Sequence, residues 1–402
     1  MIWQTTSMLI LALVLIKVRP RDDFWKLVYW PAMGLRVAGA LLMGWVYLHY
    51  LGEGDTITFH QEAFARYQQA ITSPGAYFAE LFTAQHPVFK AEARTELFTK
   101  ILSVLYLLAG GSYWIAAAFL GVISFFCAFH LTRQLSNYFP HLRTIAIIAF
   151  LAWPSVIFWS SGILKDTLTN SALMLLGSVV ITYCYRKSQP FSQLVLTFTC
   201  LLLLFYLKFY LAATAGLTLG LLAINTLLKE LRISTVGRMA LLAIHCIALL
   251  GMLSLLNFNL NIANFPQAIY TNYTQILDAS PEHHVVFENL TPTYSGLLKA
   301  SPESFFAGLF RPLLFEGSTW FLPFGLENLT LLLLTLLSIY WWRHIRMDAA
   351  GWCAIIFCSI LAITLPLAAP AFGTLIRYKT AYLPFLVFVL LYTPFRRLFQ
   401  KD

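Results

Sequence analysis

The sequence predicts an all-α membrane protein whose helices cross the bilayer many times. Hydrophobic residues make up 59% of the 402 residues, charged residues make up only 11%, and the mean hydropathy is +0.71. That balance excludes a soluble protein, which needs more charge on its surface. The apolar runs lack the period-two alternation of a membrane β-barrel, so we predict helices.

Eleven apolar runs are long enough, or nearly so, to cross a bilayer as helices. They cover residues 2–18, 30–51, 112–132, 143–163, 167–185, 190–207, 209–228, 239–256, 325–342, 349–369 and 380–394. The first run lacks the basic start and the cleavage site of a signal peptide, so we expect a retained helix. The shorter run 97–108 predicts an interfacial or re-entrant helix.

The distribution of lysine and arginine predicts the orientation of these spans. With the N-terminus outside and the C-terminus cytoplasmic, the inner turns carry sixteen basic and five acidic residues. The outer connections carry ten basic and thirteen acidic residues over far more sequence. We therefore expect a single membrane domain over 1–402, with two long outer loops. These are 52–98, which contains amphipathic helices, and 257–324.

Composition and motifs also exclude several functions. The net charge of +9 comes from short basic clusters at span ends, so we expect no nucleic-acid partner. All six cysteines fall in apolar segments, which argues against a disulfide framework or a zinc site. The chain has neither a phosphate-binding loop nor a dinucleotide fingerprint, and this argues against ATP-driven transport by this chain alone.

The first outer loop opens with an acidic, glycine-flanked segment that continues into His60 and Glu62. Glycines can hold an acid close to the membrane surface. Asp55 and Glu62 are therefore candidates for a general base or a metal ligand, and His60 for either role. In the alternative interpretation, Asp55 only caps the helix that begins near Thr56.

Cations on the same outer side are candidates to bind a phosphate. Lys165 and Asp166 stand between two apolar spans; the lysine suits a phosphate, and the aspartate suits a helix start. A snorkelling lysine is the alternative. Arg377 and Lys379 lie in the last outer turn, where interfacial anchoring is the alternative. Arg311, in the second long loop, completes the candidate set for substrate or lipid phosphate.

Three further features leave a choice open. Adjacent His283 and His284 near acids suggest a metal, but a third spaced ligand is missing. Arg36, inside a predicted span, and Lys208, at a span junction, can each pair with a carboxylate or reach a lipid phosphate. A divalent cation is compatible with the chain, although no ligand set demands one.

The first-loop acid, the amphipathic helices after it, the long late outer loop and the basic residue near the last span resemble the GT-C superfamily. These are integral-membrane glycosyltransferases that use polyprenyl-phosphate-linked sugars. The resemblance covers the whole chain as architecture. It implies that Asp55 is the first-loop catalytic acid and that Lys165 and Arg377 contact the donor phosphate.

A second resemblance is carried by the run from Pro154 through Ser161-Gly162 to Lys165-Asp166, and by Arg377-Tyr378 followed by Pro384. These segments are similar to membrane polysaccharide polymerases of the O-antigen and exopolysaccharide type. Those enzymes hold a lipid pyrophosphate with a basic residue at the corresponding helix start.

We therefore expect sugar transfer from a polyprenyl-phosphate-linked donor to a glycan, lipid or protein acceptor, on the outer face of the bacterial inner membrane. Asp55 would deprotonate the acceptor, and Lys165 and Arg377 would stabilise the leaving lipid phosphate. A polymerase is one alternative. A transporter or flippase for lipid-linked or anionic substrates is another, and a non-catalytic subunit of an envelope machine is a third.

Overall fold

The computed structural model describes residues 2–87, 91–185, 190–230, 235–256, 261–280, 282–341 and 347–399. Within these residues the secondary structure is helical, apart from an isolated bridge between His284 and Ala371. The all-α class is confirmed. The chain divides into two compact units, the first formed by Met1–Val179 and Ser188–Phe209, the second by Val180–Lys187 and Tyr210–Asp402. One membrane domain over 1–402 stays a prediction.

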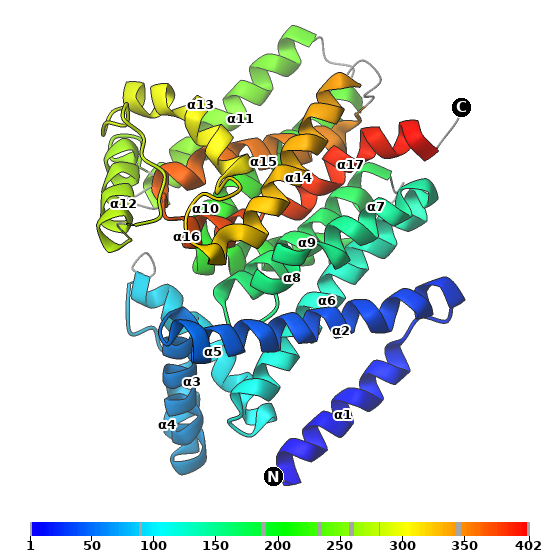
Figure 1. Cartoon of the computed structure of the whole chain (residues 1–402), viewed down its shortest axis with the longest axis vertical. Coiled ribbons are helices and arrows are strands. Elements are labelled where there is room, and N and C mark those ends of the chain that lie inside the picture. Colours follow the sequence, from blue (N-terminus) through cyan, green and yellow to red (C-terminus); the bar gives the residue numbers. More distant parts are fainter. Residues whose placement is uncertain are drawn as a thin grey trace. The chain divides into compact units, whose positions relative to one another are not determined.

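The first unit contains the predicted first outer loop and the helices around it (Figure 1). Its helices are α1 (Ile2–Val18), α2 (Asp23–Trp45), α3 (Asp55–Thr72), α4 (Pro74–Leu81), α5 (Ala91–Ala109), α6 (Tyr113–Tyr138), α7 (Arg143–Ile147), α8 (Pro154–Trp159), most of α9 (Lys165–Tyr185) and the start of α10 (Phe191–Glu230). A π-helical turn, Val46–Leu51, extends α2, and α3 then runs across the direction of α2.

Helix α2 lies close to both α6 and α8 because glycines stand at the crossings. A Cβ added at Gly39 would lie 2.9 Å from the backbone oxygen of Ile157 in α8. A Cβ at Gly121 of α6 would lie 3.1 Å from the backbone oxygen of Arg36. Backbone atoms cannot move aside as the end of a side chain can, so these contacts fix the helix spacing.

We predict that Gly39→Ala destabilises the first unit by about 1–3 kcal/mol, because the new methyl group forces α2 away from α8. A thermal unfolding curve of the detergent-solubilised protein measures the loss. Gly34→Ala in the same helix is the matched control, since a Cβ there meets nothing within 4 Å. Equal melting temperatures for Gly39→Ala and wild type would contradict this packing.

The predicted span 143–163 is not one straight helix. Its segment Ile148–Ala152 is π-helical, and Pro154 restarts the chain as the short helix α8. Proline has no N–H to donate, so the carbonyl of Phe150 loses its helical partner. The guanidinium of Arg36 donates to that carbonyl at 2.8 Å. This buried arginine therefore satisfies the backbone of a broken helix.

The remaining Arg36 contacts in the described residues are also with protein groups. Its Nη1 donates to two serine hydroxyls and a carbonyl, those of Ser124, Ser160 and Val156. The prediction that Arg36 pairs with a carboxylate or reaches a lipid phosphate is not supported. Its contacts are those of a structural residue.

Within the described residues, six helices are long and apolar enough to cross a membrane, or up to seven if one bent pair forms a single span. The six are Asp23–Leu51, Tyr113–Tyr138, Lys165–Tyr185, Phe191–Leu228, Thr319–Tyr340 and Ala349–Ala368, and the bent pair is Phe372–Lys379 with Leu383–Tyr392. Three predicted spans correspond to shorter apolar helices, Trp3–Val18, Pro140–Ala152 and Met239–Leu249. The chain therefore carries several candidate spans, while the count of eleven is not supported.

The predicted spans 190–207 and 209–228 are two parts of one element, α10, which is interrupted at Lys208. Several basic residues that predict the orientation of the spans lie outside the described residues. They are Arg186, Lys187, Arg232, Arg343, Arg346 and Lys401.

The second unit contains the rest of α10 and the later helices. These are α11 (Thr235–Leu256), α12 (Phe265–Ala279), α13 (Tyr294–Phe310), α14 (Leu322–Tyr340), α15 (Ala349–Ala368), α16 (Phe372–Lys379) and α17 (Leu383–Phe399). Gly308 lets α13 approach α15, because a Cβ there would lie 2.1 Å from the carbonyl oxygen of Ala362. Helices α12 and α13 fall within the predicted outer loop 257–324, which is thus partly helical.

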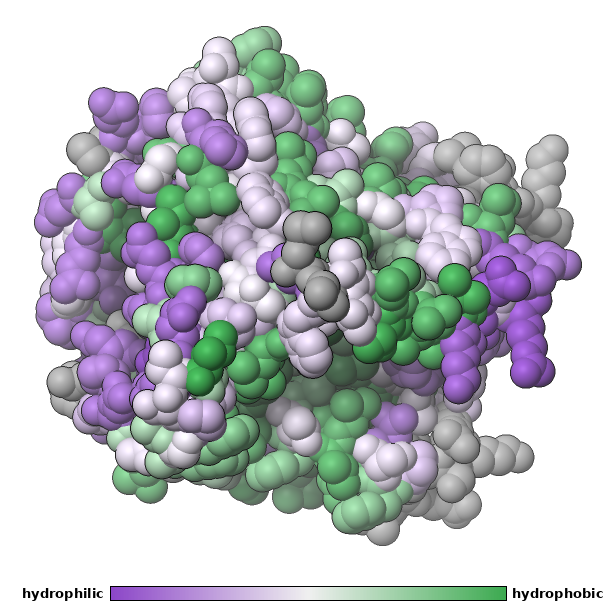
Figure 2. Space-filling view, turned by 90° about the horizontal axis from the view of Figure 1, so that it is seen from below, coloured by the Kyte–Doolittle hydropathy of each residue, from purple (hydrophilic) through white to green (hydrophobic). Residues whose placement is uncertain are grey.

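The exposed surface is consistent with a protein embedded in a membrane. Figure 2 shows many apolar side chains exposed on the surface that it draws. Large apolar side chains of α1 such as Leu9 and Leu13 are 65% and 66% exposed. Exposed leucines in such number are stable in contact with lipid rather than water.

Candidate functional site

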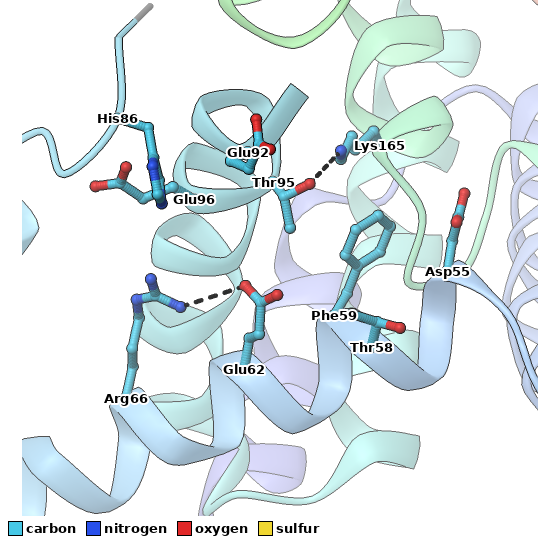
Figure 3. Close-up of a pocket in the computed structure, with 10 residues that line it drawn as sticks. All are labelled: Asp55, Thr58, Phe59, Glu62, Arg66, His86, Glu92, Thr95, Glu96 and Lys165. Atoms are coloured by element: carbon cyan, nitrogen blue, oxygen red, sulfur yellow. Dashed lines mark hydrogen bonds and ion pairs between the residues drawn. The ribbon is translucent and has the colours of Figure 1, made fainter. Parts of the chain in front are cut away.

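A polar cavity of about 380 Å³ lies within the first unit, between α3, α5 and the start of α9 (Figure 3). That volume falls in the range of small-molecule sites. Polar and charged side chains and one phenylalanine line it: Asp55, Thr58, Phe59, Glu62, Arg66, His86, Glu92, Thr95, Glu96 and Lys165. The cavity thus brings together three sequence-predicted residues, Asp55, Glu62 and Lys165.

Asp55 reaches the cavity because two glycines turn the chain into α3. Gly52 and Gly54 have φ angles of +73° and +126°, which residues with a side chain rarely adopt. A Cβ at Gly54 would lie 2.6 Å from the ring of Tyr47. Gly54 is the N-cap of α3 and Asp55 its first residue, so the capping role considered for Asp55 is wrong. Its exposed carboxylate still complements the positive end of the helix.

The cavity-facing side chains of α3 follow helical spacing. Residues 55, 59, 62 and 66 are three or four positions apart and therefore share one face. Arg66 is fixed there by two carboxylates, with its Nη1 3.7 Å from Glu62 and its Nε 3.3 Å from Glu80. Arg66 also donates to the Thr99 hydroxyl at 2.9 Å. Glu62 is thus paired with a cation in the wall of the cavity.

Lys165 enters the cavity from the first residue of α9. Its ammonium donates to the hydroxyl of Thr95 at 2.8 Å and lies 4.9 Å from the centre of the Phe59 ring. These contacts direct a half-buried cation between α3 and α5. Figure 3 shows Lys165 and Asp55 at the same end of the cavity, on either side of Phe59, with Arg66 at the far end.

Glu96 was not foreseen as part of this site. Its carboxylate accepts from the Lys100 ammonium at 2.5 Å and from the backbone N–H of Gln85 at 3.0 Å. Burial acts to raise the pKa of Glu96, but the hydrogen bonds and the charge of Lys100 outweigh it and lower the pKa. The i,i+4 spacing of Glu96 and Lys100 on a helix was the available signal.

His60 lies outside the cavity lining, although α3 carries it. Its Nδ1 is 2.7 Å from the hydroxyl of Tyr106, and its ring packs edge-on against Tyr113. Burial lowers the pKa of His60. The ring is therefore placed to support the packing of α3 on α5, and its catalytic role stays an untested prediction.

A pH effect on stability follows from His60. Because its pKa is lower in the folded protein than in the unfolded chain, where it is about 6.5, the unfolded chain binds more protons between the two values. We expect stability to be complete above pH 6.5 and to fall as the pH drops through the folded pKa. His60→Gln should show a smaller drop in melting temperature between pH 7.5 and 5.5. His141→Gln, at an exposed histidine, is the control; equal drops in His60→Gln and wild type would contradict this.

Asp166 is turned away from the cavity lining. Its carboxylate accepts from Lys208 at 2.5 Å, and both side chains are buried. This contact confirms the expectation that Lys208 can pair with a carboxylate. A substrate contact by Asp166 stays a prediction without support from the cavity.

The other three phosphate-site candidates belong to the second unit. Lys379 is buried, and its ammonium donates to the carbonyls of Leu309 and Arg311 and to Oδ1 of Asn328, at 2.8–3.2 Å. The side chain of Arg311 pairs with Glu316. Lys379 therefore connects residues of neighbouring helices, and Arg311 pairs with a residue of the loop that follows it.

Arg377 is the remaining candidate of this unit. It is half-buried in α16, with its guanidinium 5.3 Å from the centre of the Tyr378 ring. That stacking matches the tyrosine-flanked anchor considered for this turn. Arg377 as a donor-phosphate contact therefore stays a prediction.

The histidine pair of the second long loop makes contacts typical of packing. The ring of His283 lies edge-on against Phe321, and His284 Nδ1 is 3.1 Å from the carbonyl oxygen of Ser280. No group of three or more potential metal ligands occurs among the described residues.

Comparisons with known protein families, with curated proteins and with solved structures find no match to this chain. The cavity and the residues that line it are therefore the features of the first unit that indicate a function.

Proposed function

We propose that this chain is a membrane glycosyltransferase that moves a sugar from a polyprenyl-phosphate-linked donor to an acceptor hydroxyl. The observation that carries the proposal is the shared cavity of Asp55 and Lys165. A carboxylate and an ammonium at one end of a sugar-sized cavity are the two groups that this reaction needs.

The chemistry follows from these two groups. The carboxylate of Asp55 removes the proton from the acceptor hydroxyl as its oxygen attacks the anomeric carbon of the donor sugar. The bond from that carbon to the lipid phosphate breaks through a transition state with oxocarbenium character. The ammonium of Lys165 stabilises the charge that develops on the phosphate. The Phe59 ring, which lines the cavity, offers an apolar wall for the sugar.

The proposed setting is the bacterial inner membrane. In the orientation that the basic residues favour, the N-terminus lies outside and 52–98 faces the periplasm, so the cavity opens where lipid-linked sugars are used. The proposed topology has eleven spans, more than the six or seven candidate spans found among the described residues. Glycans, lipids and proteins are all acceptors of suitable chemistry.

The rival functions have less support from the described residues. A transporter for anions needs charged groups along a path through the membrane. Among the described residues, the cations buried in candidate spans are Arg36, Lys208 and Lys379, and all three bind protein groups instead. A polymerase remains chemically close, because it differs mainly in using a lipid pyrophosphate.

The experiment supplies purified protein in lipid nanodiscs with two donor classes, polyprenyl-phosphate monosaccharides and polyprenyl-pyrophosphate oligosaccharides. Released lipid phosphate and glycosylated acceptor are measured by mass spectrometry. Consumption of the monophosphate donor supports the proposal. Consumption of the pyrophosphate donor alone would replace it with a polymerase, and movement of intact lipid across the bilayer without cleavage would replace it with transport.

A further inference from the structure

Helix α10 is broken at a residue that does not break helices by itself. Lys208 has φ −148° and ψ 79°, outside the helical region, between two helical parts. Sharp breaks usually occur at proline, at glycine or where a side chain intrudes. The flanking residues 201–215 contain neither proline nor glycine. The break coincides with a tertiary contact of Lys208.

That contact is the ion pair with Asp166 at the start of α9. The two side chains are 9% and 5% exposed, and Nζ and Oδ1 are 2.5 Å apart. Removing one partner of such a buried pair strongly destabilises the fold, because the other charge is left unpaired in a medium of low dielectric.

The pair holds the residue next to Lys165. Consecutive helix residues point about 100° apart around the axis, since a turn takes 3.6 residues. With Asp166 held by Lys208, Lys165 is directed to the Thr95 hydroxyl and the Phe59 ring in the cavity. The chain entering α9 is held too, because the Thr167 hydroxyl donates to the carbonyl of Gly162 at 2.6 Å.

We propose that Lys208 is a positioning residue, which anchors Asp166 and thereby directs the side chain of residue 165 into the cavity. In the proposed reaction, on which this inference rests, Lys208 touches neither donor nor acceptor. It acts only through Asp166 and the first turn of α9. Its loss should therefore misplace the phosphate contact rather than remove it.

The test measures how accessible the side chain at position 165 is to a thiol reagent, and it requires no turnover. Lys165→Cys is introduced into a background in which the six native cysteines are replaced by alanine, and a water-soluble cationic thiosulfonate labels the thiol. Labelling is followed by intact-protein mass. Adding Lys208→Met should change the labelling rate by about tenfold, because reactivity depends on the access and surroundings of the thiol. Lys208→Arg should keep the rate close to that of the parent.

Two further variants guard against misfolding and unspecific effects. Asp166→Leu with Lys208→Met forms a neutral pair that leaves no buried charge unpaired and no hydrogen bond between the two positions, so it should fold and still change the labelling rate. Lys26→Met removes an exposed lysine that pairs with Asp23, and it should change nothing. Equal labelling rates in the parent and in the neutral pair would overturn the positioning role.

Turnover separates this inference from the function on which it rests. In an active wild type, Lys208→Met should lower turnover by up to about 100-fold, the effect of a displacement of about 1 Å, and Lys208→Arg should restore most of it. A changed labelling rate with a wild type that uses no lipid-linked donor would keep the positioning role and reject the glycosyltransferase. An unchanged labelling rate with a wild type that uses a lipid-linked donor would keep the glycosyltransferase and reject the positioning role.

Discussion

Replacing Asp55 by asparagine is expected to lower sugar transfer by about 10²–10⁴-fold, the usual contribution of a general base. The amide keeps the size of the carboxylate but cannot accept the proton of the acceptor hydroxyl. The exposed side chain stands at the first residue of α3, so the fold should be retained apart from a small loss of helix-end stabilisation. Initial rates with saturating donor and acceptor measure the effect.

The control for this prediction is Glu53→Gln. Glu53 is an exposed acid two positions earlier and does not line the cavity. It should retain turnover close to that of wild type. If Asp55→Asn also retained wild-type turnover, Asp55 would not be the base, and Glu62 would become the next carboxylate to replace.

Replacing Lys165 by methionine should lower turnover by about 10²–10³-fold, the range measured when one transition-state donor is removed. Methionine keeps the length of the side chain and its packing on Phe59 but lacks the charge. The loss should be greatest for donors whose leaving group carries the most negative charge. Lys165→Arg should recover part of the rate, because it restores a cation of different shape.

Lys26→Met serves as the matched control, since the Lys26 side chain is 41% exposed and pairs with Asp23 at the surface. The same rate for Lys165→Met and Lys26→Met would contradict a phosphate contact at position 165. Binding of a non-hydrolysable donor analogue to both variants, measured by calorimetry, separates a weaker ground state from a slower reaction.

The sequence predicted the helical elements well where local signals were strong. The run 2–18 corresponds to α1, and 349–369 to α15. The run 143–163 predicts one span from its apolar composition, but Pro154 interrupts the helix. The carbonyl that loses its partner there accepts a hydrogen bond from Arg36, which lies far away in the sequence. The runs 190–207 and 209–228 predict two spans that meet at Lys208, whereas the structure has one helical element interrupted there. The contact of Lys208 with Asp166 leaves no signal in the local sequence.

In the candidate site, too, local sequence signals identify some residues, while others depend on contacts between helices. Asp55 and Lys165 could be selected by residue type and by their places at predicted helix starts, and the structure brings them to one cavity. Arg66 and Thr95 were missed because each acts through a partner on another helix. Pairings across such distances depend on packing and cannot be derived from spacing along the chain.

Photolabelling of the donor site is the most direct measurement of the central claim, that one cavity holds the sugar of a lipid-linked donor. The probe is a polyprenyl-phosphate sugar that carries a diazirine, applied to wild-type protein in nanodiscs and mapped by mass spectrometry. We predict labels within 55–66 and 91–100 that disappear when unlabelled donor is in excess. Donor-sensitive labels confined to the described residues of the second unit, with none in those two segments, would contradict the account.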